Sequence, residues 1–227
     1  MARIGILADY NSQSETHIAT DKCLALAAVN LGVDVHGEWV PTQLISKTDI
    51  GSFDGLIVNT GVYDDRDAVL NTLRIAREGN IPTLATCGGF QHMIIEYARN
   101  VLGLNGVGHA EFDLDSTDHI IVPLQCSLRG READIAIVLD SQVGRLCKSN
   151  AVTEKFYCSF GISPAYLEQL GHSPLRIVGT DDDGLVRVTE LPGHPFFIGT
   201  LFVPQARALR GEVHPLVFGL VESAIKR

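Results

Sequence analysis

The sequence predicts a single α/β domain over residues 1–227, with a central, mostly parallel sheet flanked by helices. In the first half, short apolar runs alternate with helix-length stretches, which is the pattern of a parallel sheet covered on both faces. In the second half, shorter apolar runs follow one another closely, which predicts additional, partly antiparallel strands. No linker, repeat or low-complexity segment divides the chain, and 227 residues can bury a full core.

The first half alternates strands and helices along the chain. Three helices are predicted, and glycines near their ends, Gly32, Gly79 and Gly103, favour termination because glycine readily adopts the left-handed conformation. The predicted strands are 3–8, 33–40, 54–59 and 81–86, and the predicted helices are 16–31, 68–78 and 91–102.

The second half is predicted to contain five short strands and a final helix. Residues 181–184 read Asp-Asp-Asp-Gly, in which Asp-Gly is a turn signal, so we expect a hairpin turn there rather than a calcium loop. The predicted strands are 120–123, 135–139, 175–179, 185–190 and 196–202, and the predicted helix is 215–225.

Composition excludes several classes of function. The net charge is −9 and no basic run occurs, so a nucleic-acid partner is not expected. No apolar run approaches the roughly 18 to 20 residues of a membrane span, and the N-terminus lacks the layout of a signal peptide, so we expect a cytoplasmic protein without a membrane partner. Five cysteines without a CxxC pair predict neither a disulfide framework nor a zinc site.

A group of histidines and acidic residues around position 110 invites a metal interpretation. His109 and His119 flank Glu111, Asp113 and Asp115, but the spacing matches no ligand pattern. We therefore expect a solvated loop there, with no metal and no cofactor.

The segment around Cys87 carries the strongest chemical signal. An apolar strand ends at Cys87, Gly88 and Gly89 follow, and a helix begins, as in a nucleophile elbow. A helix N-terminus lowers the pKa of a nearby thiol, and its free N–H groups can stabilise an oxyanion. The spacing alone equally allows a small buried residue at a strand end. His92 lies five residues after Cys87, which is not one helical turn, so we expect a surface or packing role for it.

Residues 87–101 resemble a family signature. They include Cys-Gly-Gly-Phe-Gln and Ile-Glu-Tyr-Ala-Arg-Asn-Val, similar to C-L-G-M-Q and I-E-F-A-R-N-V in the class I glutamine amidotransferase domain of CTP synthase. Further similar segments follow in order at 109–112, 190–197 and 214–221. The resemblance spans nearly the whole chain and implies the flavodoxin-like fold of that family.

The resemblance also implies a set of roles for individual residues. Cys87 would attack the side-chain amide of glutamine, Gly61 and Gly88 would supply oxyanion N–H groups, and Gln91 and Glu111 would contact the substrate. The implied small-molecule substrate is glutamine or a related amide or amino acid. The resemblance leaves open a separate synthetase subunit and a homo-oligomer as partners. No phosphate-binding loop occurs, so we do not expect the chain to make CTP alone.

The chain departs from the family at catalytic positions. The family's F-H-P-E-F holds the catalytic histidine and glutamate, but residues 202–206 place Val203 and Gln205 there. The arginine expected to hold the substrate carboxylate is Ser159, and the P-G-G-F-G oxyanion stretch is altered at 59–63. Because a missing general base costs about 10² to 10⁴ in rate, we expect weak or absent glutamine hydrolysis.

Cys158 lies where the family has a histidine near the glutamine pocket, so it could face Cys87 or pack as a buried residue in a strand. Three hypotheses remain: a divergent amidotransferase acting through Cys87, a two-cysteine thiol or redox enzyme using Cys87 and Cys158, and a non-catalytic ligand-binding module.

Overall fold

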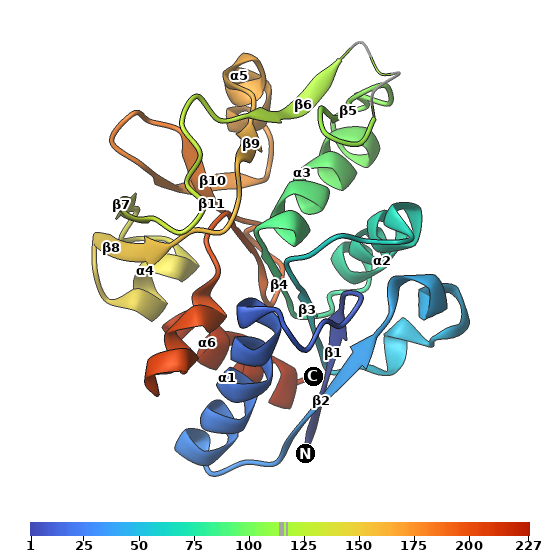
Figure 1. Cartoon of the computed structure of the whole chain (residues 1–227), viewed down its shortest axis with the longest axis vertical. Coiled ribbons are helices and arrows are strands. Elements are labelled where there is room, and N and C mark those ends of the chain that lie inside the picture. Colours follow the sequence, from blue (N-terminus) through green and yellow to red (C-terminus); the bar gives the residue numbers. More distant parts are fainter. Residues whose placement is uncertain (114–115, 117) are drawn as a thin grey trace.

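The computed structural model describes residues 1–113, 116 and 118–227 (Figure 1). Its first half is the predicted alternation of strands and helices, with two 3₁₀ segments after the second strand. These elements are β1 (Ala2–Leu7), α1 (Glu15–Leu31), β2 (Val35–Val40), η1 (Thr42–Lys47), η2 (Ile50–Ser52), β3 (Gly55–Val58), α2 (Arg66–Glu78), β4 (Thr83–Thr86) and α3 (Gly88–Asn100).

The second half is a series of short strands with small helices between them. These elements are β5 (Gly108–His109), β6 (His119–Pro123), β7 (Glu132–Ile137), α4 (Gln142–Cys147), β8 (Ala151–Lys155), β9 (Phe160–Ile162), η3 (Pro164–Tyr166), α5 (Leu167–Gly171), β10 (Arg176–Thr180), β11 (Val186–Glu190), β12 (Phe197–Thr200), η4 (Pro204–Arg210) and α6 (Pro215–Ile225).

A nine-stranded sheet forms the centre, in the order β2-β1-β3-β4-β12-β11-β10-β7-β8. Its first five strands are parallel to their neighbours, and the pairs from β12 to β8 are antiparallel. A smaller sheet, β5-β6-β9, lies beside α3. The predicted mostly parallel sheet with added antiparallel strands is therefore confirmed.

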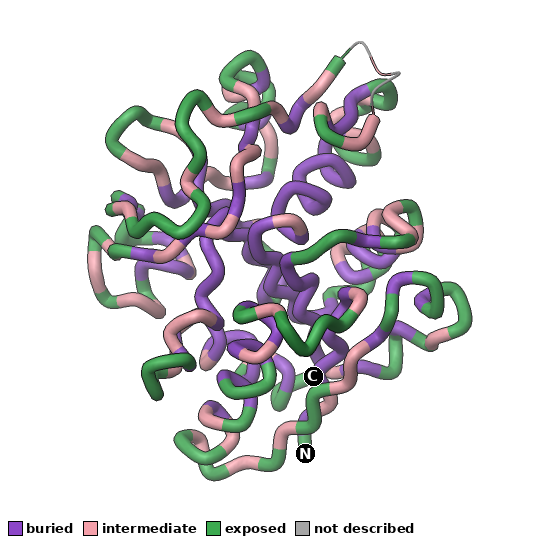
Figure 2. The backbone as a smooth tube through the Cα atoms, viewed as in Figure 1, coloured by how far each residue is buried: buried purple, intermediate pink, exposed green. Residues whose placement is uncertain are grey.

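Successive residues of the central strands face opposite layers. Ile57 and Leu84 belong to the apolar cluster that includes residues of α1 and α6, whereas Val58 and Ala85 belong to the cluster that includes residues of α2. A parallel strand buried on both faces needs apolar residues at consecutive positions, which explains its unbroken apolar runs. Figure 2 shows the resulting buried centre, with exposure at the helix surfaces and loops. No helix in the described part of the chain is long and apolar enough to cross a membrane.

Some predicted boundaries were wrong. The helix predicted at 91–102 begins at Gly88, because the two glycines after Cys87 belong to its first turn, and it ends at Asn100. Prediction missed the helices α4 and α5, of six and five residues, and the short strands β5, β8 and β9. Elements this short show too little periodicity to be recognised. The turn at 181–184 is confirmed: Gly184 has φ 74° and donates to the Asp181 carbonyl at 2.9 Å.

Candidate functional site

Cys87 occupies a strained turn between β4 and α3. Its φ of 50° and ψ of −106° lie outside the usual regions for a residue with a side chain. The backbone N–H donates to the Thr200 carbonyl of β12 at 2.8 Å, which fixes the turn to the neighbouring strand. A Cβ at Gly89 would lie 2.0 Å from the Val58 carbonyl oxygen, so this position requires glycine. The strain and the close approach are those of a nucleophile elbow.

The surroundings of Cys87 favour its thiolate. A side-chain hydrogen bond with Cys158 is the largest cause of its lowered pKa, and burial acts in the opposite direction. Hydrogen bonds from the Thr60 side chain and the Gly88 backbone, and the charge of Arg129, also lower the pKa. A buried thiol would otherwise have a raised pKa, so the net lowering favours a reactive thiolate over an inert buried thiol.

Cys158 shares the pocket with Cys87, and the two sulfurs are neighbours. It lies in the loop between β8 and β9, not in a strand, so the strand interpretation was wrong. Its side chain is buried, and its Sγ lies 3.5 Å from the Leu201 carbonyl oxygen, the other acceptor within reach of its single proton. The pKa of Cys158 is raised well above its ordinary value, first by the hydrogen bond with Cys87 and then by burial. Cys158 is therefore the protonated partner of the pair.

The segment after β3 brings Gly61 against the Cys87 turn. Gly61 has φ 150°, and a Cβ on Gly88 would lie 3.3 Å from the Gly61 carbonyl oxygen. The Nε2 atom of His17 lies 2.9 Å from the Thr60 carbonyl oxygen, which holds the start of this segment. The two glycines expected to supply oxyanion N–H groups therefore lie next to each other at the N-terminus of α3.

Tyr63 adds a hydroxyl group that sequence reasoning did not assign. The ring is buried, and the hydroxyl donates to the Asn59 carbonyl. Burial raises the pKa of Tyr63 well above its ordinary value, and the charge of Cys87 contributes. The phenol is thus a neutral neighbour of the reactive thiol.

Gln91 and Glu111 also lie at this pocket, as the resemblance implied. Gln91 is buried; its Nε2 donates to the Phe160 carbonyl at 3.0 Å, and its Oε1 lies 3.1 Å from His109 Nε2. The backbone N–H of Glu111 donates to His109 Nδ1 at 3.1 Å, so His109 Nε2 carries the proton toward Gln91. Glu111 itself is exposed at the rim.

These residues enclose a cavity of about 280 Å³, the size of a small metabolite site. Both thiols and the glycine turn line it, together with aromatic groups and two arginines. The lining includes Thr60, Gly61, Tyr63, Arg66, Cys87, Gly88, Gln91, His92, Glu111, Phe112, Arg129, Tyr157, Cys158, Ser159 and Phe160.

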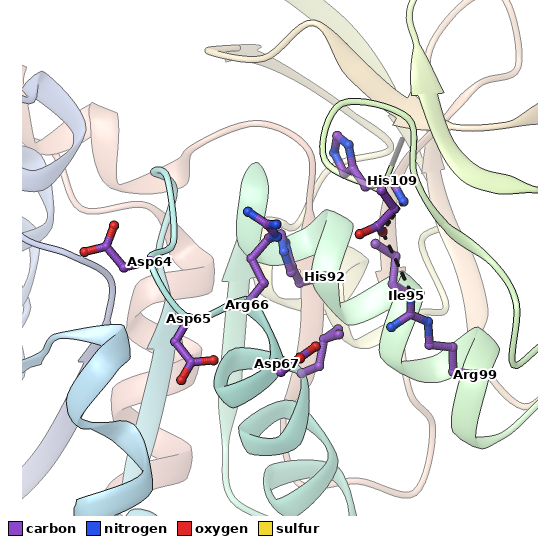
Figure 3. Close-up of a pocket in the computed structure, with 10 residues that line it drawn as sticks. Asp64, Asp65, Arg66, Asp67, His92, Ile95, Arg99 and His109 are labelled. Atoms are coloured by element: carbon purple, nitrogen blue, oxygen red, sulfur yellow. Dashed lines mark hydrogen bonds and ion pairs between the residues drawn. The ribbon is translucent and has the colours of Figure 1, made fainter. Parts of the chain in front are cut away.

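A second polar cavity, also of about 280 Å³, lies on the other side of His92. Figure 3 shows Arg66 and His92 at its centre, with Asp64 and Asp65 to the left, Asp67 below, and His109 and Arg99 to the right. Arg66 and His92 line both cavities. The thiol cavity contains Cys87, whose pKa is lowered, so we take it as the candidate active site.

Two histidines here are more buried than we expected. Burial lowers the pKa of His92 to about 4 and that of His109 to about 3, so both are neutral at pH 7. His92 Nδ1 donates to the Gly88 carbonyl at 2.8 Å, which excludes a surface role. The solvated-loop prediction was wrong for His109, because its ring packs against Phe112 and Phe160.

The metal interpretation finds no support among the described residues, which contain no group of three or more side chains able to hold a metal ion. Asp115, one of the acidic positions in that interpretation, lies outside the described residues.

Val203 and Gln205, which the resemblance puts in place of the family's histidine and glutamate, are fully buried. Val203 precedes η4, and Gln205 lies in its first turn. The Gln205 amide donates weakly to Asn59 and Thr86, both at 3.3 Å, and its Oε1 has no hydrogen-bond partner among the described residues. Within the described chain no imidazole is hydrogen-bonded to Cys87.

Arg66, Arg129 and Tyr63 are the functional candidates that sequence reasoning missed. Arg66 and Arg129 reach the cavity from segments whose sequences carry no recognisable motif. The altered stretch at 59–63 was the available signal for Tyr63, because it shows that the oxyanion segment ends in a bulky residue.

Comparisons with known proteins agree with this geometry. The family model for glutamine amidotransferase class-I matches residues 16–189. The chain therefore belongs to the class I glutamine amidotransferases.

Within the class the chain is similar to CTP synthases. It is 31% identical to the CTP synthase of Methanopyrus kandleri over 241 residues, covering 98% of this chain and 45% of that protein. It is 29% identical to the CTP synthase of Nostoc punctiforme, covering 98% and 44%. The chain thus spans less than half the length of these relatives.

Solved structures support the fold. The glutaminase domain of Trypanosoma brucei CTPS with bound acivicin superposes with a TM-score of 0.88 at 22% identity, covering all of this chain and 95% of that one. A glutamine amidotransferase from Thermotoga maritima gives a TM-score of 0.61 at 10% identity, covering 100% and 97%. The flavodoxin-like amidotransferase fold predicted from the sequence is confirmed.

Proposed function

We propose that this protein is a divergent CTP synthase-type amidotransferase whose Cys87 pocket binds glutamine or a related amide, with weak or absent glutamine hydrolysis. The observation that carries the proposal is the pairing of a preorganised nucleophile with a thiol instead of an imidazole. The proposal is supported by the sequence, in which Val203 and Gln205 stand where the resemblance implies the catalytic histidine and glutamate; neither side chain can act as a general base.

The residues of the site support the first half of the reaction. The Cys87 thiolate would attack the amide carbon, while the N–H groups near Gly61 and Gly88 would hydrogen-bond the developing oxyanion. The C–N bond must then break, and ammonia must leave with an added proton. In this pocket the Cys158 thiol is the proton donor next to Cys87, and its raised pKa makes it a poor acid at pH 7. Turnover should therefore stall at proton transfer.

Release of glutamate from glutamine tests this proposal directly. We expect at most weak release by the wild-type protein and none by Cys87→Ala. Rapid, Cys87-dependent release at the rate of a complete triad would contradict the proposal, because it would require a base that we have not identified. Release that persists in Cys87→Ala would remove Cys87 as the nucleophile.

The share of each CTP synthase that this chain matches bears on its partners. Because the chain matches less than half of each CTP synthase, we propose that any CTP synthesis would need a synthetase component beyond these 227 residues, such as a separate subunit. Co-purification from the native source, followed by mass spectrometry of the bound proteins, tests this; recovery of the chain without a synthetase would contradict it.

A second candidate function, thiol-based redox chemistry, is favoured by the contact between the two sulfurs. The Cys87 thiolate would attack a hydroperoxide, the O–O bond would break, and an alcohol would leave, giving a sulfenic acid. The Cys158 sulfur would then attack the Cys87 sulfur and expel water, leaving a disulfide that an external dithiol would reduce. Peptide mapping after peroxide treatment should find a Cys87–Cys158 disulfide. Oxidation of Cys87 to sulfinic acid without a disulfide would contradict this candidate.

A further inference from the structure

Two arginines reach the thiol cavity without an acidic partner. Arg66 and Arg129 line the cavity, and neither forms an ion pair within the described part of the chain. Elsewhere arginines such as Arg187 and Arg207 pair with Asp181 and Glu154. In a chain with 27 acidic and 18 basic residues, two unpaired guanidinium groups at one cavity indicate a site for an anion.

Arg129 lies beside the position where the family resemblance expects an arginine. That position is Ser159, whose hydroxyl lies 2.8 Å from the Ser127 hydroxyl. The backbone N–H of Arg129 donates to the same Ser127 oxygen at 3.3 Å. The loop that carries Arg129 is therefore hydrogen-bonded to Ser159 at the cavity wall.

Arg66 approaches the cavity from the start of α2. Its guanidinium stacks over the Phe112 ring, 4.8 Å from the ring centre. Stacking holds the plane of the group while its N–H donors remain free to bind a planar anion. Glu111 is the acidic side chain in the same lining, so the three charges together favour an anion with a smaller cationic region.

We propose that Arg129, assisted by Arg66, is the carboxylate anchor of the Cys87 pocket and selects substrates that carry a negative group. This inference rests on the proposed function only because both concern the Cys87 pocket; it does not assume that Cys87 hydrolyses glutamine. It assigns the recognition of the substrate carboxylate to a loop residue that takes over from position 159. Substrates lacking an anionic group should then bind poorly, whatever reaction Cys87 performs.

Alkylation of Cys87 by two reagents of different charge tests the anchor. Iodoacetate carries a carboxylate and iodoacetamide is neutral, and peptide mass spectrometry would follow Cys87 separately from the other cysteines. Arg129 lowers the pKa of Cys87, so its loss reduces the thiolate fraction and slows the reaction with both reagents equally. The ratio of the iodoacetate rate to the iodoacetamide rate does not depend on the thiolate fraction, so it reports only on recognition of the reagent's charge. One unit charge at about 4 Å in water corresponds to about a fivefold effect. We expect Arg129→Gln to lower the ratio about fivefold, and Arg66→Gln to lower it less.

Arg131→Gln is the matched control. Arg131 is exposed, lies two residues from Arg129 and does not line the cavity, and its loss changes the net charge equally. An equal fall in the ratio for Arg131→Gln and Arg129→Gln would overturn the proposal. The effect would then come from the net charge of the protein and not from an arginine in the cavity.

Equilibrium binding decides the proposal even if Cys87 proves unreactive. Calorimetric titration of the wild-type protein with L-glutamate should give binding that Arg129→Gln weakens about fivefold and Arg131→Gln leaves unchanged. No binding by the wild-type protein would overturn the anchor. Failure of glutamine hydrolysis would leave this result intact, so the two proposals fail separately.

Discussion

Replacing Cys158 with alanine should raise the pKa of the Cys87 thiol and slow its reaction at neutral pH. The hydrogen bond between the two side chains is the largest of the causes that lower the pKa of Cys87, and burial opposes it. Alanine removes this donor and leaves burial in place. The thiolate then loses its principal partner while keeping the cost of desolvation.

The size of the effect follows from that one interaction. A hydrogen bond to a charged group contributes about 1.5 to 3 kcal/mol, and a thiol is a weak donor, so the lower end applies. Because about 1.4 kcal/mol corresponds to a factor of ten, the thiolate fraction at neutral pH should fall about tenfold. Thr60, the Gly88 backbone and Arg129 remain, which keeps the loss from being larger.

The rate of Cys87 modification by iodoacetamide, followed from about pH 5 to 10, measures this change. Cys147→Ala is the matched control, because Cys147 lies outside the cavity and burial raises its pKa to about 11. Cys158→Ala should move the rise in the rate to higher pH, and Cys147→Ala should not. A profile that is unchanged or shifted to lower pH in Cys158→Ala would refute the assignment of Cys158 as the thiolate's donor.

Three further outcomes are expected. The double variant Val203→His/Gln205→Glu should raise glutamate release about 10²-fold or more, measured beside each single variant; no gain would show that more than the base is missing. His92 and His109 stay neutral when folded, with pKa values of about 4 and 3, whereas unfolded histidine binds a proton near pH 6.5. The free energy of unfolding in urea should therefore fall from about pH 6.5 toward pH 4, by at most about 1.4 kcal/mol per pH unit for each histidine, and His92→Gln should flatten the slope. Gly89→Ala should destabilise the fold by several kcal/mol or prevent folding, because its Cβ would meet a β3 carbonyl at 2.0 Å; a thermal midpoint equal to wild type would contradict this.

The sequence predicted the parallel half of the fold because each of its strands is buried on both faces. Such strands read as unbroken apolar runs, and the helices between them are long enough to show periodicity. The antiparallel half was predicted less completely, because β8 is partly exposed and carries polar residues such as Thr153 and Glu154, and β9 has only three residues. Their position depends on partners distant in the chain, which local patterns do not reveal.

The residues of the candidate site likewise fall into a group that the sequence predicted and a group that it did not. Cys87, Gly88 and Gln91 belong to one continuous segment, so a local motif was sufficient to place them together. Cys158 and Arg129 reach the cavity from separate loops, and their approach to Cys87 is set by the pairing of β7 with β8 and of β6 with β9. A single sequence indicates such contacts only through a family resemblance, which suggested Cys158 but not Arg129.

The topology is compatible with the proposal that this site keeps a nucleophile without its family's base. Cys87 ends β4, and Val203 follows β12, the parallel neighbour of β4. The Cys87 turn is fixed by its backbone hydrogen bond to Thr200 and by the close packing of Gly89, and neither contact involves the side chain at position 203. Replacing that side chain therefore leaves the turn unchanged. A third element, the β8–β9 loop, then supplies Cys158 as the new neighbour of the thiolate. Because each component comes from a different element, the chemistry of the partner can change while the reactive cysteine and its geometry stay the same.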